Sequence, residues 1–284
     1  MSFYPALKDG LSCGRTGKVE EKRMIRVLYH YRRYILQNAW NDLRYRYAGS
    51  GMGVIWNVIS PLAQILVYTI VFTKVMSIKL PDISSEFAFP LYLCSGFLPW
   101  IAFSECVLRG SNAFLENANY LRKMPIPEQV FVAQAAMSAT ISLFISWVLL
   151  FGLAITMRYP PTWLWLMLPL VGILFQGFAF GLGLLLSSII VFFRDIGQLL
   201  VIFLQIWMWM TPIVYPDSIL PERFVMYMRF NPAYPFIHTM RDLFLFGRLP
   251  EVWMWWMMCT WAFTMPILGY LVLRKLRLEI RDVL

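Results

Sequence analysis

The side chains that could carry out chemistry in this chain are few and widely separated. The two histidines, His30 and His238, are isolated, so neither belongs to a recognisable metal cluster or nucleophile–base pair. The glycine-rich segment at 14–19 lacks both the four-residue spacer and the Ser/Thr of a phosphate-binding loop. The cysteines are scattered without CxxC spacing, as small apolar residues would be, at Cys13, Cys94, Cys106 and Cys259. We therefore predict no catalytic residue, no metal site and no cofactor bound by this chain.

A different signal comes from polar side chains that recur within apolar segments. One stripe has spacings of three and four residues and comprises Asn57, Ser60, Gln64 and Tyr68. A second stripe repeats on one face of a later segment and comprises Gln198, Gln205 and Trp209. Polar groups in hydrocarbon normally face protein or a water-filled cavity. Hydrogen bonding between helices and the lining of a translocation path are both compatible with the pattern.

The composition places these stripes in a membrane. Of the 284 residues, 59% are hydrophobic and 14% charged, whereas soluble domains carry about 25% charged residues. A helix needs roughly 20 apolar residues to cross the hydrocarbon core. We predict an all-α integral membrane protein with six transmembrane helices, at about 54–75, 87–108, 129–156, 163–192, 196–216 and 252–273, within a membrane domain at 49–284.

The distribution of charge gives the topology. The net charge of +9 could suggest nucleic acid, but most of the 25 Lys and Arg lie on one side of the predicted spans. By the positive-inside rule this side is cytoplasmic, so we expect a multi-pass protein of the inner membrane with both termini inside. Anionic membrane lipids, and not nucleic acid, are the expected partners of the basic residues. The N-terminus has no apolar core that would resemble a signal peptide.

The N-terminal part joins a surface helix to the first span with almost no linker. Residues 1–21 are polar and are predicted to be flexible, whereas 22–48 form a basic amphipathic helix. Its apolar stripe can lie in the headgroup region, or the helix can serve as a docking face for a cytoplasmic partner. The glycines that follow are the candidate hinge, at Gly49, Gly51 and Gly53.

Three further features stand out, of which Glu105 lies near the inner end of the second predicted span and the other two lie outside the spans. The 109–128 loop is predicted to hold a short helix at about 111–120 that is stopped by Pro125 and Pro127. Glu105 is expected to reach the membrane surface as a single carboxylate. The outer loop at 217–251 contains two apolar stretches, predicted to be short helices at 221–229 and 233–246 that lie in the interface or re-enter it.

Five short motifs, in order, resemble the ABC-2 type permeases that export lipid-linked polysaccharides, including O-antigen, teichoic-acid and capsule exporters. They are DLRYRYAGSGMGVIWNVISPL at 42–62, YLRKMPIP at 120–127, FFRDIGQLL at 192–200, TPIVYP at 211–216 and NPAYP at 231–235. The resemblance covers about residue 40 to the C-terminal end. The polar extension before residue 40 is a departure from the family pattern. The Arg-Tyr-Arg-Tyr sequence at 44–47 is closer to that of O-antigen exporters than to that of capsule exporters.

The resemblance implies a homodimer of this subunit joined to two copies of a separate cytoplasmic ABC ATPase, which would hold ATP and Mg. It implies that spans one and five line the path, that the two outer helices act as a periplasmic gate, and that the N-terminal helix and the 111–128 loop contact the ATPase. The candidate coupling residues are Arg33, Asn112, Glu116, Arg122 and Lys123.

The expected function is ATP-driven export of an undecaprenyl-diphosphate-linked, O-antigen-like glycan. Basic residues near the inner face could attract the diphosphate, and the candidates are Arg44, Arg46 and Arg194. An ABC-2 exporter of small amphiphiles or drugs is the alternative. A membrane glycosyl- or acyltransferase is disfavoured by the scarcity of acid/base residues. A stand-alone channel or ion-coupled carrier is disfavoured because no span centre carries an ionisable residue.

Overall fold

The structure is a computed structural model that describes residues 24–46, 53–71, 88–216 and 221–284. Within these ranges every regular element is a helix, as predicted. The elements before the long bundle are α1 (Met24–His30), α2 (Arg32–Tyr45), η2 (Gly53–Ile55) and α3 (Trp56–Ile70). The rest are α4 (Ala88–Glu116), α5 (Ala118–Lys123), α6 (Gln129–Thr156), η4 (Trp163–Met167), α7 (Leu168–Ile190), α8 (Asp195–Met210), α9 (Glu222–Met228), α10 (Tyr234–Arg241), η6 (Asp242–Phe246) and α11 (Val252–Val283).

Apolar helices occupy all six predicted span positions, but only four of them have the length of a span. These four are α4, α6, η4 with α7, and α11. The other two are shorter: α3 has 15 residues and α8 has 16, which correspond to lengths of about 22–24 Å at 1.5 Å per residue. Six full-length spans are therefore not observed among the described residues. Residues 72–75 of the first predicted span lie outside them.

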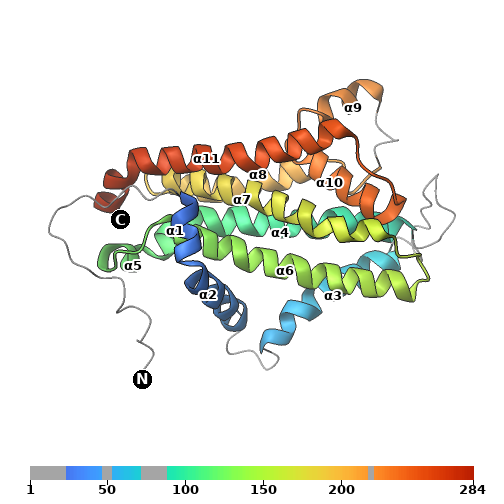
Figure 1. Ribbon diagram of the computed structural model, residues 1–284, viewed down its shortest axis with the longest axis horizontal. Helices are drawn as coiled ribbons and strands as arrows, with labels where there is room; N and C mark the ends of the chain where they lie inside the picture. Colours follow the sequence, from blue (N-terminus) through green and yellow to red (C-terminus); the bar gives the residue numbers. More distant parts are fainter. Residues whose placement is uncertain (1–23, 47–52, 72–87, 217–220) are drawn as a thin grey trace.

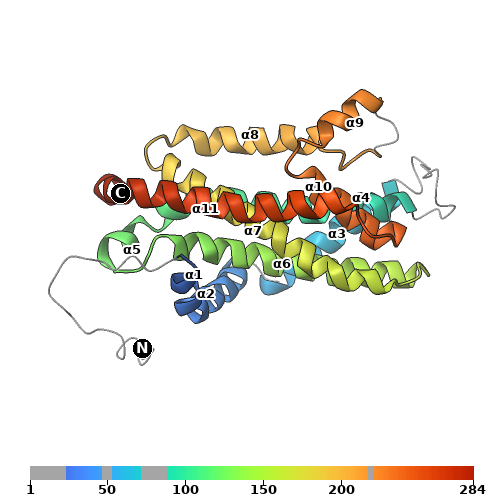
Figure 2. The ribbon, with the colours of Figure 1, turned by 45° about the horizontal axis from the view of Figure 1, so that its top comes forward.

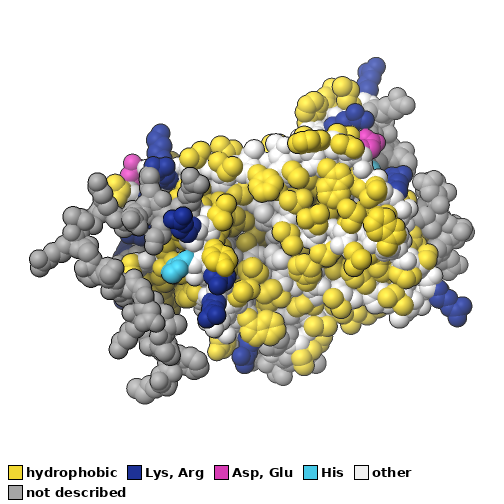
Figure 3. Space-filling model, in the orientation of Figure 1, with side chains coloured by type: hydrophobic (Ala, Val, Ile, Leu, Met, Phe, Trp, Pro, Cys, Tyr) yellow, Lys and Arg dark blue, Asp and Glu magenta, His cyan; other side chains and the backbone are white. Residues whose placement is uncertain are grey.

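Helices α4 and α7 form the centre of the bundle, and α6 and α11 flank them (Figures 1 and 2). Hydrophobic side chains cover the middle of the face in Figure 3, while Lys and Arg lie toward its two ends. α1, α5 and the C-terminal end of α11 lie at the same end of the bundle (Figure 1). We call this the inner end and the opposite one, where α9 lies, the outer end.

Two local predictions differ from the structure. The N-terminal segment forms two helices because the backbone leaves helical geometry at Tyr31, where ψ is 8°. The apolar stripe, for which the headgroup region was one of two alternatives, is buried against α6, including Ile35, Ala39 and Leu43. The region 111–120, predicted as one short separate helix, is divided between two helices. α4 continues to Glu116, and α5 follows and ends at Lys123, ahead of Pro125.

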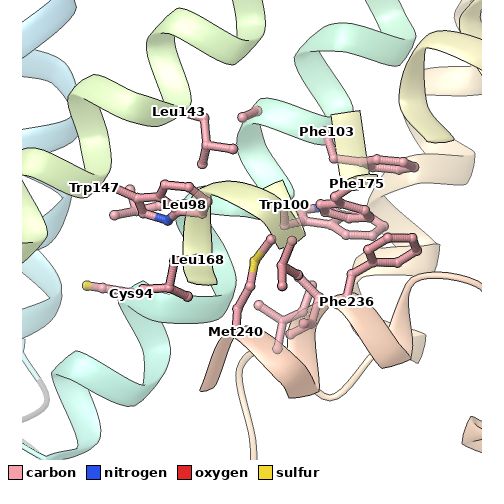
Figure 4. Close-up of a cluster of buried hydrophobic side chains, with 14 of the residues drawn as sticks. Cys94, Leu98, Trp100, Phe103, Leu143, Trp147, Leu168, Phe175, Phe236 and Met240 are labelled. Atoms are coloured by element: carbon pink, nitrogen blue, oxygen red, sulfur yellow. The ribbon is translucent and has the colours of Figure 1, made fainter. Parts of the chain in front are cut away.

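The outer segment after α9 enters the core. Seven of the eight residues of α10 are buried, and α10 contacts α4, α7 and α11. Phe236 of α10 stacks on Phe175 of α7 at a centroid distance of 4.8 Å, and Phe175 stacks on Phe103 of α4 at 4.4 Å (Figure 4). The aromatic column joins three helices, so α10 is packed into the core of the bundle and does not lie on its surface.

Helices α7 and α11 approach so closely that only glycine fits at their crossing. A Cβ atom on Gly181 would lie 2.2 Å from the backbone nitrogen of Pro266, and one on Gly269 would lie 2.7 Å from the Gly181 carbonyl oxygen. The GxxxG pair of Gly177 and Gly181 thus serves packing within the chain.

We expect Gly181→Ala to destabilise the protein by about 1–3 kcal/mol, because the added methyl group meets backbone that cannot move aside. The measurement is the temperature at which detergent-purified protein loses half of its monodisperse peak. Gly152→Ala on α6 is the matched control, since nothing lies within 4 Å of its added Cβ. Equal melting of the two variants would contradict the tight crossing.

Candidate functional site

Three of the four residues of the first polar stripe line one cleft. Asn57, Ser60 and Gln64 of α3 face α4 and α6 across an open hollow with a volume of about 100 Å³. We call it the α3/α4/α6 cleft. Its remaining lining consists of Arg46, Pro61, Leu98, Ile101, Ala102, Glu105, Ser142 and Ser146. Most of the α3 stripe therefore faces an open cleft formed within one chain.

Tyr68, the fourth member of the stripe, lies outside this lining. Its ring packs edge-on against Phe97 at a centroid distance of 5.2 Å, beside the main hydrophobic core. Asn57 also has a structural contact, because its carboxamide donates to the Leu43 carbonyl oxygen at 3.0 Å. This bond joins the start of α3 to the end of α2.

Four charged side chains at the inner end of the cleft form a cluster of ion pairs. Arg46 Nη2 lies 2.6 Å from Glu105 Oε1, and Arg109 Nη2 lies 2.6 Å from Asp42 Oδ1. Two longer contacts close the ring, Arg46–Asp42 at 3.5 Å and Arg109–Glu105 at 3.4 Å. Ser138 of α6 donates to Asp42 at 2.7 Å. This inner ion cluster has equal numbers of acids and bases and joins α2, α4 and α6.

The cluster changes the roles expected for two of its members. Glu105 is not a single carboxylate that reaches for the surface, because Arg46 and Arg109 both pair with it. Arg46, a candidate for the diphosphate, is already paired with two carboxylates. A phosphate would have to displace these carboxylates from Arg46. The observed contacts of Arg46 instead attach the end of α2 to α4.

Asp42 stays ionised within this cluster. Burial raises the pKa of its carboxyl, but the hydrogen bonds and charges of Arg109, Ser138 and Arg46 outweigh burial and hold the pKa below its ordinary value of 3.8. Its contribution to stability is therefore complete at neutral pH. That contribution is lost only as the pH falls below 3.8 through the lower pKa of the folded protein.

The other two basic candidates are exposed. Arg44 lies on the outward face of α2, and Arg194 borders a second hollow at the inner end, beside Leu115, Val191 and Val283. The structure does not bring Arg44, Arg46 and Arg194 together at one site, because they lie on the α2 surface, in the ion cluster and at the α7–α8 turn.

The second polar stripe faces away from the chain's own core. Gln198, Gln205 and Trp209 are all exposed on α8, and 54% of Trp209 is accessible. The neighbouring Trp207 points inward and packs edge-on against Trp100. Helix α8 contacts mainly α4 and lies along one side of the bundle (Figure 2). One chain therefore does not bring its two polar stripes into one cavity.

Buried charges at the outer end were missed in the sequence. Arg241 of α10 is buried, and its guanidinium donates to the carbonyl oxygens of Pro212 and Ile213 and lies 3.8 Å from the centroid of Tyr92. We call this the outer arginine clamp. The signal was an arginine inside the apolar stretch 233–246, shortly after the NPAYP motif.

Asn231 reinforces the outer arginine clamp. It accepts from Trp207 Nε1 at 2.8 Å and donates to Thr211 Oγ1 at 2.8 Å. The TPIVYP and NPAYP motifs are thus in direct contact, and together they attach the outer end of α8 to α10.

A second missed charge lies at the inner end. Glu128, before α6, is fully buried and pairs with Arg277 at 3.0 Å and Arg281 at 2.7 Å, both from the inner extension of α11. In the sequence, Glu128 directly precedes the predicted span at 129–156. A negative charge at the N-terminal end of a helix interacts favourably with the helix dipole. The partners of Glu128 lie 149 and 153 residues away and could not be read from the sequence.

Four of the five coupling candidates are exposed. Arg33 is on the outward face of α2, Glu116 ends α4, and Arg122 and Lys123 lie on α5. Asn112 differs, because it is half-buried, donates to the Leu108 carbonyl oxygen at 3.0 Å and lies against Gly197. It therefore joins α4 to the start of α8.

Two of the three candidate hinge glycines, Gly49 and Gly51, lie outside the described residues. Gly53 is described, and its φ of +49° is a left-handed conformation that favours glycine. It starts the short helix that leads into α3. Across the described part of the chain, no three His, Cys, Asp or Glu side chains gather as a metal site would require.

The comparison with protein families decides the identity of the membrane domain. The family described as "ABC-2 type transporter" matches residues 33–245, which include α2, the cleft, the inner ion cluster and the outer arginine clamp. The chain belongs to the ABC-2 type transporter family. It is therefore a multi-pass membrane protein and a transporter subunit, in agreement with the resemblance that its motifs indicated.

Named relatives cover most of the chain. An O-antigen export system permease protein RfbA of Myxococcus xanthus is 29% identical over 231 residues, which span 81% of this chain and 86% of the relative. A protein of the same name from Klebsiella pneumoniae is 27% identical over 86% of this chain and 92% of its own. The polysialic acid transport protein KpsM of Escherichia coli is 24% identical over 74% and 80%.

The inner ion cluster predicts a charge-specific loss of stability. Glu105→Gln should lower stability by about 1–3 kcal/mol, because Arg46 and Arg109 then share one carboxylate. The value is below the 3–5 kcal/mol of a fully buried pair, since 20–30% of these side chains is exposed.

A double-mutant cycle with Arg46→Gln, read by thermal unfolding in detergent, should give a favourable coupling energy. Arg44→Gln on the same helix is the control and should change stability by no more than about 0.5 kcal/mol. A coupling energy of zero would contradict the cluster.

Proposed function

We propose that this ABC-2 subunit is the permease of an ATP-driven exporter for an undecaprenyl-diphosphate-linked, O-antigen-like polysaccharide. The observation that carries the proposal is the near-full-length similarity to two proteins named as O-antigen export permeases. The more distant match, KpsM, is also named for polysaccharide transport. The chemistry of the chain fits, since a long glycan needs polar groups along its route and no bond in it has to be broken.

The proposed assembly is a homodimer with two ATPase subunits. Helix α8 supports the first part, because its outward face carries large apolar side chains beside its polar stripe, namely Leu199, Ile202, Phe203 and Ile206. A second copy packed near α8 and α3 would bring the polar stripe of α8 and that of α3 toward one translocation path. One chain alone does not bring these two stripes together. ATP and Mg would bind to the partner ATPase.

The proposed orientation places the inner end in the cytoplasm. α1, α5 and the C-terminal end of α11 meet there, and exposed basic residues such as Arg33 and Arg122 would face the ATPase and the anionic inner leaflet. α9 and α10 then lie at the periplasmic side of the inner membrane. There they would act as the gate.

In the proposed mechanism, nucleotide binding closes the ATPase dimer and displaces α2 and α5. The inner ion cluster carries a displacement of α2 into α4 and α6, because strong charge-assisted bonds link the three helices. The Asn57–Leu43 bond carries it into α3. Gly53, with its left-handed backbone, is where the chain would bend between α2 and α3.

Deletion of the gene tests the export function. Cells without this chain should lose the surface glycan and accumulate lipid-linked glycan in the cytoplasm, because synthesis continues when export stops. Surface labelling and extraction of the lipid-linked pool measure the two effects, and a plasmid copy of the intact gene should reverse both. An unchanged surface glycan would refute the proposed function.

Charge reversal on α5 tests the coupling surface. Arg122→Glu combined with Lys123→Glu should reduce recovery of the ATPase with the purified permease by about tenfold, or about 1.4 kcal/mol. Both side chains are exposed, so folding should be unaffected. Arg158→Glu, exposed at the outer end of α6, is the matched control. If the α5 variant retains the ATPase as the control does, α5 is not the docking element.

A further inference from the structure

The α3/α4/α6 cleft contains polar groups that the chain itself does not satisfy. Ser142 Oγ is buried and has no hydrogen-bond partner. Ser60 and Gln64 reach the same space from α3, while Ser146 directs its hydroxyl to the Ser142 carbonyl oxygen at 2.9 Å. Unsatisfied polar atoms at membrane depth are costly, so lipid tails are poor occupants of this cleft.

The cleft is also electrically balanced. The charged groups in its lining are Arg46 and Glu105, whose side chains lie 2.6 Å apart. A diphosphate needs cations that are not already paired, and Arg46 is additionally held by Asp42 at 3.5 Å. The lining therefore does not favour the anionic end of a lipid-linked glycan.

The remaining groups match a neutral, hydroxyl-rich ligand. Serine hydroxyls and a glutamine carboxamide each offer both donors and acceptors, as sugar hydroxyls do. Pro61, Leu98 and Ile101 supply apolar surface for the C–H face of a sugar ring. The cleft volume of about 100 Å³ is below the roughly 300–1,000 Å³ of sites for drug-sized ligands, which limits its occupant to a single small unit such as one sugar ring.

We propose that the α3/α4/α6 cleft of each subunit binds one neutral sugar unit through Ser60, Gln64 and Ser142, apart from the diphosphate. The proposal rests on the proposed function and deepens it. The same chemistry could be supplied by the exported glycan or by the sugar headgroup of a membrane glycolipid, and the experiment separates these sources.

Photo-crosslinking in cells tests the occupant directly. Ser60, at the exposed rim of the cleft, is replaced as Ser60→benzoylphenylalanine in the full transporter. Leu66→benzoylphenylalanine on another face of α3 is the control, since Leu66 is 43% exposed and does not line the cleft. After illumination, the purified chain is probed by mass and by glycosidase digestion, in cells that make the glycan and in cells blocked in its synthesis.

We expect a glycosidase-sensitive adduct at position 60 and none at position 66. An adduct that disappears when synthesis is blocked identifies the exported glycan, and one that persists identifies a glycolipid headgroup. Adducts with acyl chains alone at both positions would overturn the proposal. If gene deletion removes the surface glycan but position 60 captures no sugar, the cleft proposal fails and the proposed function stands; if deletion leaves the glycan unchanged, the proposed function fails.

Filling the cleft supplies a second test. Ser142→Leu should slow export by at least roughly tenfold, the factor that corresponds to about 1.4 kcal/mol, because it removes the buried hydroxyl and occupies the space. Thr264→Leu makes a similar change on the exposed face of α11 and should alter export by less than about twofold. Membrane levels are compared by immunoblot. Equal export by the two variants at equal levels would contradict a site in the cleft.

Discussion

The arrangement of this protein depends on the inner ion cluster, in which Asp42 and Arg46 of α2 bond to Glu105 and Arg109 of α4. Each charge would be costly near the bilayer on its own, but the closed ring with Ser138 neutralises all four. The cluster fixes a surface helix to two helices of the bundle without covalent linkage. It also forms the inner boundary of the α3/α4/α6 cleft, so the element proposed to receive force and the site proposed to hold substrate share residues.

At the outer end a charged side chain again joins helices, but its partners are backbone carbonyl groups and not carboxylates. Arg241 enters the core and bonds to two backbone carbonyl groups where α8 ends, and its guanidinium lies over the ring of Tyr92. These carbonyl groups belong to the segment that follows α8, so the clamp fixes the path of the chain where it leaves the helix. Between the two ends, the Phe103–Phe175–Phe236 column holds α4, α7 and α10 together. Helix α8 otherwise contacts mainly α4, through Trp207 and Trp100 among others.

The sequence predicted the helical class and the location of the apolar segments, because composition and charge-free runs follow directly from the cost of burying charges in lipid. It also identified Asn57, Ser60 and Gln64 as one polar face. It could not identify what that face meets, since Ser142 and Glu105 come from distant helices. Periodicity likewise identified the apolar stripe of α2 but not its partner, and the stripe is buried against α6. The pairing of Arg46 and the burial of Glu128 and Arg241 depend on tertiary contacts.

The most direct test of the account is transport by the purified complex. The permease and its ATPase are reconstituted in vesicles with lipid-linked glycan, oriented so that ATP reaches the inner end, and a glycosidase enclosed in the lumen reports arrival of the glycan. The account predicts lumenal digestion that requires ATP hydrolysis and that declines when Glu105→Gln breaks the inner ion cluster, while ATP is still hydrolysed. Digestion at the same rate without ATP, or no digestion by a complex that hydrolyses ATP, would contradict it.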